Sequence, residues 1–326
     1  MNNPTQESAS APIVVALGGN AIAPGTDPFD SSVEHQRRRI SETSRILAEA
    51  IAEGMQLVVT FGNGPQVGNL LVKNEAAKNL VPAIPLDWCV AQTQATIGLE
   101  LASTLTADLS CLGISRVVVP LLSRALVEPD DPAFAKPSKP IGRYVESAVE
   151  PDLTIPPAHR WSEVRPSLWR RTVPSPQPIE LLDTAALDLV LNAGGIPITC
   201  GGGSVPVIRA DDRYVGVEAV IDKDSTAVLL AEHVNAGRLV ILTDVPGAAV
   251  SFGTPNERYL GEVSVSELRA YLREDQFGEG SMAAKVRAVI EFVDRTGQTA
   301  SIGALENAGD VLRGLTGTRV VAVGES

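Results

Sequence analysis

The sequence predicts an α/β protein in which helices cover both faces of a mainly parallel β-sheet. Short apolar runs recur along the 326 residues, among them "IVVAL" at 13–17, "LVVTF" at 57–61 and "LVILT" at 239–243. These runs are apolar throughout, which is typical of parallel strands that are covered on both faces. Longer segments of helical period separate them, and such an alternation of strand and helix gives a layered sheet with right-handed crossovers.

The individual elements follow from periodicity and from the residues that end each segment. After the strand at 13–17, an amphipathic helix is expected from about 33 to 53, where Gly54 is a C-cap candidate. Further strands are expected at 116–122, 196–200, 299–305 and 318–323, and further helices at about 66–78, 87–109, 265–274 and 282–296.

Composition argues against several classes of protein. A net charge of −12 argues against nucleic-acid binding, because phosphate backbones are bound by clustered Lys and Arg. Three cysteines without CxxC spacing indicate neither a disulfide framework nor a zinc site, and the three histidines are scattered. The first eleven residues lack the basic and apolar regions of a signal peptide, and no run reaches the roughly 18–20 apolar residues that cross a bilayer. We therefore expect a cytoplasmic protein with no metal ligands of its own and no membrane segment.

One proline-rich region, from about 126 to 178, interrupts the alternation of strand and helix. Its composition alone is compatible with a disordered linker. Trp161, Trp169 and several aliphatic residues lie among the prolines, which favours a small ordered excursion with contacts of its own. A flap of this length beside a site could exclude water from it. Both interpretations are open at this point.

Glycine-rich turns follow three of the expected strands. The carboxyl ends of parallel strands lie on one edge of a sheet, where ligands bind. Glycine lets the backbone approach a ligand closely, and the next helix presents free N–H groups and the positive end of its dipole. Any one turn could be a plain chain reversal, but their recurrence favours a patch of N–H donors for an oxyanion. The residues concerned are Gly18, Gly19, Asn20, Gly62, Asn63, Gly64, Gly201, Gly202 and Gly203.

Two lysines lie where helices are expected to begin. Lys223 sits between two acids in "IDKDS", and Asp224 could cap the next helix or hold a neighbouring cation. Lys285 lies about one turn inside a helix that opens with Gly280 and Ser281. A lysine there is unfavourable beside the positive helix end unless a phosphate is bound, although a surface position is the plain alternative. Neither GxxxxGK[ST] nor GxGxxG occurs, so lysines and backbone amides would be the stabilisers of phosphoryl transfer.

A series of longer motifs occurs in order along the chain: "VVALGGNAI", "GNGPQVGNLL", "KPIG", "VPSPQPI", "CGGGSVPVI", "GVEAVIDKD", "LVILTDV" and "GSMAAKV". With these motifs the chain resembles the carbamate kinases of the amino acid kinase superfamily over nearly its whole length. The resemblance implies reversible phosphoryl transfer between ATP and carbamate, usually run from carbamoyl phosphate and ADP. It also implies Mg²⁺ bound mainly through the nucleotide phosphates, a cytoplasmic homodimer, a place in arginine metabolism, and an αβα sandwich with a small protruding subdomain.

The resemblance also divides the chain and assigns roles to its residues. Residues 1–208 would form the phosphoryl-acceptor lobe, with the protruding subdomain at about 126–178, and residues 209–326 the nucleotide-binding lobe. The catalytic residues would be Lys139, brought in by the subdomain, and Lys223, Asp224 and Lys285. The glycine turns and Ser204 would surround the acceptor and the transferred phosphoryl group. The nucleotide would be bordered by Lys223, Thr243, Asp244, Val245, Gly280, Ser281, Met282 and Lys285.

Three positions depart from the motifs of that family. Phe61 stands where a histidine is usual, Ser204 where a glycine is usual, and Ala284 where a proline is usual. Phe61 would remove a hydrogen-bond donor from the edge of the acceptor pocket, and Ser204 would add bulk and a hydroxyl. Neither change touches the lysines, so phosphoryl transfer is expected. Two alternatives stay open: the same fold acting on another small carboxylate or phosphate, and a non-catalytic ligand-binding homologue.

Overall fold

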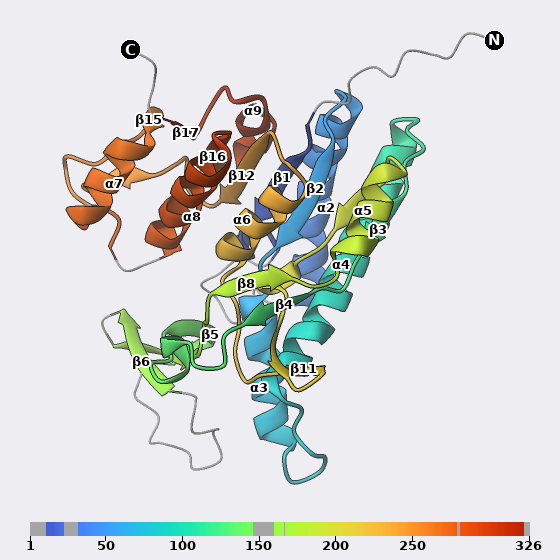
Figure 1. Cartoon of the computed structure of the whole chain (residues 1–326), viewed down its shortest axis with the longest axis vertical. Helices are drawn as coiled ribbons and strands as arrows, with labels where there is room; N and C mark the ends of the chain where they lie inside the picture. Colours follow the sequence, from blue (N-terminus) through green and yellow to red (C-terminus); the bar gives the residue numbers. More distant parts are fainter. Residues whose placement is uncertain (1–10, 23–31, 146–159, 166, 279–280, 323–326) are drawn as a thin grey trace.

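The computed structural model describes residues 11–22, 32–145, 160–165, 167–278 and 281–322. Its centre is an eight-stranded sheet (Figure 1), which confirms the expected α/β class. Neighbouring strands run parallel except β16 and β17, so β15 and β17 run against the others. In order across the sheet, the strands are β15 (Glu262–Ser264), β17 (Thr318–Val321), β16 (Thr299–Ala304), β12 (Arg238–Thr243), β1 (Ile13–Leu17), β2 (Leu57–Phe61), β9 (Ile196–Ile198) and β3 (Val118–Pro120).

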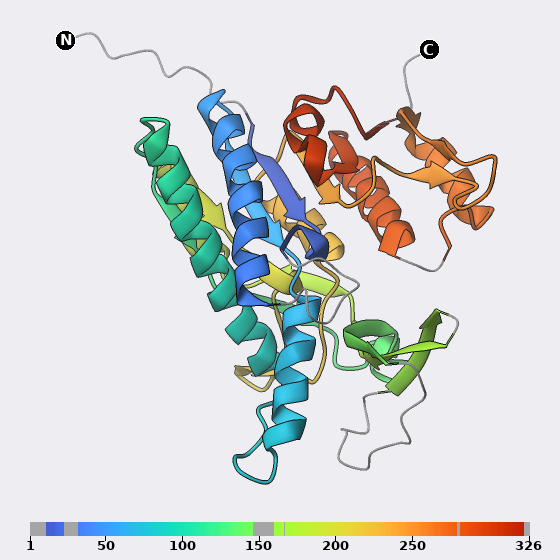
Figure 2. The same ribbon diagram turned by 180° about the vertical axis from the view of Figure 1, so that it is seen from behind.

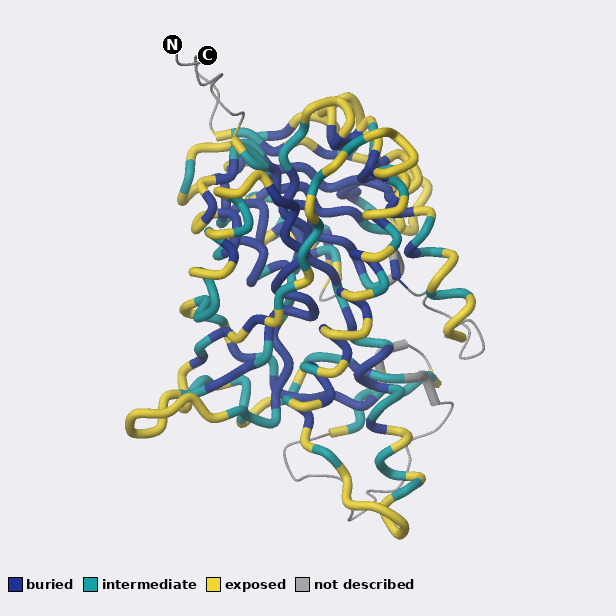
Figure 3. Tube along the Cα trace, turned by 90° about the vertical axis from the view of Figure 1, so that its right-hand side faces the viewer, coloured by how far each residue is buried: buried dark blue, intermediate teal, exposed yellow. Residues whose placement is uncertain are grey.

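Helices cover both faces of this sheet, so the molecule is an αβα sandwich (Figures 1 and 2). Strand β1 shows why the strands are apolar throughout: Val14 and Ala16 belong to one buried cluster, and Val15 and Leu17 belong to the other. Figure 3 shows the same burial along the central strands. One face is covered by α5 (Thr184–Asn192), α6 (Lys223–His233), α7 (Val265–Arg273) and α8 (Ser281–Thr296). The other face is covered by α2 (Val33–Ala52), α4 (Leu86–Cys111) and α9 (Ala308–Arg313).

The ends of the helices follow local signals in the sequence. Ser32 caps α2 by accepting a hydrogen bond from the His35 amide at 3.2 Å, and Gly54 follows the helix with φ 90°. Ser264 and Glu267 form a reciprocal capping box at α7. In the part of the chain that the structure describes, no helix combines the length and the apolar character that a membrane crossing needs.

A four-stranded sheet and a three-stranded sheet lie beside the main one, and neither was expected from the sequence. In order, the strands of the first are β11 (Arg213–Gly216), β10 (Val205–Ala210), β4 (Arg124–Val127) and β8 (Pro178–Leu181), and those of the second are β5 (Lys139–Val145), β7 (Leu168–Val173) and β6 (Arg160–Arg165). The second sheet and the short helix η1 belong to the proline-rich region, which projects from the main body in Figure 1. Where the structure describes this region, its regular elements are strands and the helix η1, and residues 146–159 and 166 lie outside the described part.

The remaining elements are short, apart from α3. A hairpin joins β13 (Ala249–Val250) and β14 (Arg258–Tyr259). The other helices are α1 (Gly19–Ile22), α3 (Gly64–Ala77), η1 (Pro132–Phe134), η2 (Gly201–Gly203) and η3 (Leu305–Asn307).

The proline-rich excursion packs against α3 through a contact between two glycines. A Cβ atom at Gly68 of α3 would lie 1.9 Å from the Cα of Gly142 in β5, and Gly142 itself has φ 72°. Beside this contact, Ile141 of β5 is buried in one apolar cluster with Val67 of α3. The excursion is therefore docked on the helix that begins at the second glycine turn.

Candidate active site

The predicted glycine turns meet at the carboxyl ends of neighbouring strands. The Gly18 amide donates to the Leu242 carbonyl at 2.8 Å, which ties the end of β1 to the end of β12. The Gly62 amide donates to the Leu17 carbonyl at 3.0 Å, which ties the end of β2 to the end of β1. The third turn, η2, follows β9, which pairs with β2. The sequence-based expectation that these turns share one edge of the sheet holds in the structure.

Several of the glycines are required because the turns pack directly on one another. A Cβ atom at Gly62 would lie 3.1 Å from the backbone nitrogen of Gly19. A Cβ atom at Gly202 would lie 2.0 Å from the Nδ2 atom of Asn63, and Gly202 has φ 63°. Asn63 is itself fixed, because its Nδ2 donates to the Thr93 hydroxyl at 2.8 Å. Protein packing therefore requires glycine at positions 62 and 202, whether or not a ligand is bound.

Two glycines in the same place have no such structural reason. Among the described residues, a Cβ atom at Gly64 would meet no atom within 4 Å, and one at Gly19 would meet only the Pro65 ring, at 3.8 Å. Neither residue has the positive φ that favours glycine. Both lie in the first turn of a helix, where free amides and the helix dipole favour an anion. The open space beside Gly19 and Gly64 is where a ligand could lie.

The other residues of the predicted glycine turns also lie in this region. Gly203 is packed against Ile221, because a Cβ atom there would lie 2.5 Å from the Ile221 carbonyl oxygen. The Thr226 hydroxyl of α6 donates to the Gly203 carbonyl at 2.9 Å, which fixes η2 against α6. Asn20 lies in α1, where the structure describes its backbone only.

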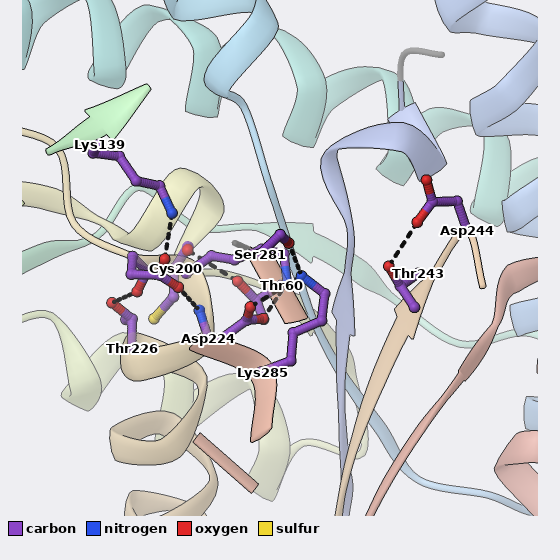
Figure 4. Close-up of polar contacts among 11 residues, drawn as sticks. Thr60, Lys139, Cys200, Asp224, Thr226, Thr243, Asp244, Ser281 and Lys285 are labelled. Atoms are coloured by element: carbon purple, nitrogen blue, oxygen red, sulfur yellow. Dashed lines mark hydrogen bonds and ion pairs between the residues drawn. The ribbon is translucent and has the colours of Figure 1, made fainter. Parts of the chain in front are cut away.

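Asp224 brings two of the predicted lysines together (Figure 4). Its carboxylate is 4% exposed and pairs with Lys223 through Oδ1 and with Lys285 through Oδ2, the latter at 3.4 Å. Lys285 Nζ also donates to the Ser281 hydroxyl at 2.6 Å. Burial lowers the pKa of Lys223 and nearby Lys285 lowers it further, against the opposing effect of Asp224. Two buried ammonium groups thus share one carboxylate, an arrangement that favours the arrival of another anion.

Lys223 connects this charged cluster to the glycine turns. A Cβ atom at Gly62 would lie 3.4 Å from Cδ of Lys223, so the lysine side chain runs beside the turn that ends β2. The lysines at 223 and 285 come from the first turns of α6 and α8, the two helices that pack on each other over one face of the sheet. The predicted lysines and glycines therefore surround one site.

Lys139 reaches the same site from the excursion, but its partner was not predicted. Its ammonium pairs with Asp222, and Figure 4 shows Lys139 pointing down from its strand toward the cluster around Asp224. Asp222 is also the N-cap of α6, since its Oδ1 accepts a hydrogen bond from the Asp224 amide at 2.9 Å. The sequence analysis offered capping as one role for Asp224, and the structure gives that role to Asp222. The signal was present, because an acid stands directly before the lysine that opens α6.

The residues expected to border the nucleotide fall into two groups. Thr243 ends β12, and its hydroxyl donates to Asp244 at 3.1 Å; Figure 4 draws this pair to one side of the lysine cluster. Val245 follows them in the same loop. Ser281 and Met282 begin α8 next to Lys285, with Met282 packed on the buried cluster of that face. Gly280 lies outside the described residues.

Two of the three departures from the family motifs, Phe61 and Ser204, lie behind the glycine turns. Phe61 is 2% exposed, and a Cβ atom at Gly201 would lie 2.4 Å from its ring, so the ring fills the space beneath η2. Ser204 is fully buried, with its hydroxyl 2.9 Å from the Ser123 hydroxyl. Its backbone has φ 73° and ψ 163°, a conformation that is nearly restricted to glycine. Both side chains shape the wall of the site from inside the protein.

Comparisons with known proteins agree with this geometry. Residues 11–303 match the model of the amino acid kinase family. The carbamate kinase of Lentilactobacillus hilgardii is 43% identical over 298 residues, which are 90% of this chain and 92% of the relative. The carbamate kinase of Pyrococcus furiosus is 41% identical, over 95% of this chain and 98% of the relative. The structure of the carbamate kinase from Giardia lamblia bound to AMP-PNP superposes with a TM-score of 0.87 at 34% identity, over 97% of this chain and 99% of that chain. This chain belongs to the amino acid kinase family.

Proposed function

We propose that this chain is a carbamate kinase, which transfers a phosphoryl group reversibly between ATP and carbamate. The observation that carries the proposal is the pairing of Asp224 with both Lys223 and Lys285 beside the glycine turns. The choice of carbamate as the acceptor is supported by relatives with the name carbamate kinase, which are 38–43% identical over most of the chain. Phosphoryl transfer depends mainly on positioning and on neutralising charge, and the described site supplies groups for both.

In this proposal each group acts on charge or position. A carbamate oxygen attacks the γ-phosphorus of ATP, the bond to the β,γ-bridging oxygen breaks, and ADP leaves with that electron pair; the reverse reaction returns the phosphoryl group to ADP. Lys223 and Lys285 neutralise charge on the moving group and on the nucleotide phosphates, while Lys139 approaches from the excursion. The acceptor lies against Gly19 and Gly64. No general base is required, because carbamate is already an anion.

The nucleotide would enter as its Mg²⁺ complex. Within the described ranges, no group of three His, Cys, Asp or Glu side chains could hold a metal ion. The metal would therefore be bound mainly through the nucleotide phosphates, as Mg²⁺ usually is in phosphoryl-transfer sites. When bound, it supplies further neutralisation of phosphate charge. Thr243, Asp244, Val245, Met282 and Ser281, with Gly280, would border the nucleotide on this side of the site.

The direct test is to mix the protein with carbamoyl phosphate and MgADP and follow ATP in a coupled assay. We expect steady turnover that requires both substrates. Absence of turnover above background would contradict the proposal. A panel of other small carboxylates and phosphates, with ADP release from MgATP as the readout, separates a change of acceptor from loss of catalysis. Tight nucleotide binding with no turnover on any acceptor would point to a ligand-binding homologue instead.

The variant Phe61→His tests whether the departure at position 61 changes the acceptor. Because the Phe61 ring lies beneath Gly201 and not in the open space of the site, we expect carbamoyl phosphate to be used by both proteins. A strong gain of activity in the variant would show instead that position 61 selects the acceptor.

We also propose that the protein is a homodimer that joins two copies at the β3 edge of the main sheet. Edge strands offer unpaired backbone groups, and exposed apolar patches mark interfaces. Trp88 and Leu99 lie eleven residues apart, close to three helical turns, on one side of α4. Other apolar side chains from this side, where Figure 1 groups α4, α5 and β3, are also largely exposed: Val117, Leu122 and Leu189. A second copy would cover them.

A cytoplasmic location is proposed as well. Cys89 and Cys200 are buried free thiols and Cys111 is an exposed one, and free cysteines suit a reducing compartment. Cell fractionation followed by immunodetection checks the location. The link to arginine metabolism stays a prediction.

A further inference from the structure

The backbone of Lys139 is held in place by its neighbours, whereas the direction of its side chain depends on the groups that the ammonium contacts. It is the first residue of β5, where it pairs in register with the buried Val173 of β7. Just after Val173, the Pro174 carbonyl accepts a hydrogen bond from the Val220 amide at 3.0 Å, which ties the end of β7 to the segment before α6. On its other side the excursion is docked on α3 through Gly142. The strand that carries Lys139 is therefore held at its first residue and at Gly142, and the long side chain of Lys139 is the part that remains to be positioned.

Asp222 is the group that places this side chain. Its Oδ1 is used by the cap of α6 and its Oδ2 by the Lys139 ammonium, so both carboxylate oxygens are engaged. The Lys139 side chain is 36% exposed, so solvent can compete for it when the pair is broken. Although burial opposes it, the charge of Asp222 raises the pKa of Lys139, and the same pair lowers the pKa of Asp222 against the effect of burial.

The charges of the site balance closely without a substrate. Three ammonium groups, of Lys139, Lys223 and Lys285, face the two carboxylates of Asp222 and Asp224, which leaves one net positive charge. Asp224 is 4% exposed and is bound by two lysines, whereas the Asp222 side chain is 18% exposed and shares its pair with one. Of the two carboxylates, Asp222 therefore competes less strongly with an incoming phosphoryl group for a lysine ammonium.

We propose that Asp222 is a positioning residue that holds Lys139 at the start of α6 and competes with the phosphoryl group for its ammonium. In the free protein the carboxylate keeps the lysine pointing into the site. When a phosphoryl group binds, the ammonium is shared between the carboxylate and the phosphoryl oxygens. The identity of that phosphoryl group rests on the proposed function, but the competition itself can be tested with inorganic phosphate.

The test measures the reactivity of Lys139 by trace acetylation of the folded, full-length protein with acetic anhydride. The labelled protein is then digested, and the acetylation of each lysine is measured by mass spectrometry. Lys136, exposed on the same excursion, is the internal reference. Asp222→Asn removes the charge, and asparagine keeps an oxygen that can cap α6. Loss of the opposite charge lowers the pKa of Lys139 and leaves more of its amine unprotonated, so labelling of Lys139 relative to Lys136 should rise about tenfold.

Phosphate protection supplies the second readout. Inorganic phosphate should protect Lys139 from acetylation in both proteins, and removal of the competing carboxylate should lower the concentration for half-protection at least about threefold. Asp131→Asn is the matched control, because Asp131 also caps a helix of the excursion and its two carboxylate oxygens accept from the Ala133 and Gln177 amides and not from a lysine; it should change neither value. Asp222→Ser, which retains a capping oxygen, repeats the test if Asp222→Asn does not fold.

Either of two results overturns the inference. Unchanged labelling of Lys139 in both position-222 variants would show that Asp222 does not hold the lysine. An unchanged or higher phosphate concentration for half-protection would show that the carboxylate does not compete. If the wild-type protein lacks turnover with carbamoyl phosphate while both labelling results are as expected, the proposed function fails and the role of Asp222 stands.

Discussion

A methyl group at position 64 should separate the stability of this protein from its activity. Gly64 begins α3, and a Cβ atom there would meet no atom of the described part of the chain within 4 Å. Its φ is not positive, so alanine can adopt the same backbone. Because alanine restricts the unfolded chain more than glycine does, Gly64→Ala should raise the free energy of unfolding by about 0.4–1 kcal/mol.

The same methyl group should damage catalysis, because it takes space beside the amides that we assign to the acceptor. A displacement of about 1 Å in a reacting group costs on the order of 10²-fold in rate, which corresponds to about 2.7 kcal/mol in the activation free energy. The assay is kcat/KM for carbamoyl phosphate, with urea unfolding measured on the same samples.

Gly261→Ala is the matched control for this experiment. Gly261 also has open space around a Cβ atom and no positive φ, and it lies between β14 and β15, away from the glycine turns. It should leave kcat/KM unchanged. If Gly64→Ala is stable and its kcat/KM stays within about threefold of the wild type, the space beside Gly64 does not hold the acceptor and the reasoning from open glycines is refuted.

Three further outcomes are expected. Lys285→Ala should lower kcat by about 10²–10³-fold, since it removes one electrostatic stabiliser, whereas Arg295→Ala at the exposed end of α8 should not; equal activity of the two variants in the coupled assay would remove Lys285 from the mechanism. Ser204→Gly should raise the free energy of unfolding by about 1 kcal/mol in urea, because relief of backbone strain exceeds the lost hydroxyl contact; a less stable variant would show that the strain is small. Leu99→Glu should convert the proposed dimer to a monomer in light scattering after gel filtration, and an unaltered mass would argue against the proposed interface.

The main sheet could be predicted from the sequence because its strands are covered on both faces. Strand β1 was expected at 13–17 and occupies Ile13–Leu17, and the helix expected at about 33–53 occupies Val33–Ala52. Uninterrupted apolar runs and glycine stops are strong signals for such elements. Strand β3 is shorter than expected, Val118–Pro120, because it forms the edge of the sheet and pairs only with β9.

The small sheets could not be predicted because their strands carry the signals of loops. Pro140 lies in β5, Pro178 begins β8 and Pro206 lies in β10. Proline removes an amide donor and usually ends a strand, but edge strands such as β5 and β8 tolerate it, and β10 begins to pair with β11 only at Val207, one residue after Pro206. These strands are also partly exposed, so they lack the continuous apolar character of β1.

The site was predicted where residue types alone carry the signal, and missed where partners are distant in sequence. The glycine turns and the lysines of α6 and α8 stand out by spacing. The Lys139–Asp222 pair spans 83 positions and depends on how the excursion docks, which no local pattern encodes. The placement of Phe61 was also unexpected: its ring lies beneath Gly201, because β2 turns that side chain into the core.

The contact between Gly68 and Gly142 couples the position of α3 to that of the excursion. Since the two backbones touch with no side chain between them, neither can slide or tilt without displacing the other. A movement of the excursion that carries Lys139 toward or away from α6 would therefore also displace α3 and the turn at Gly64. Grafting a foreign excursion onto this scaffold would succeed only if the graft brought its own glycine opposite position 68.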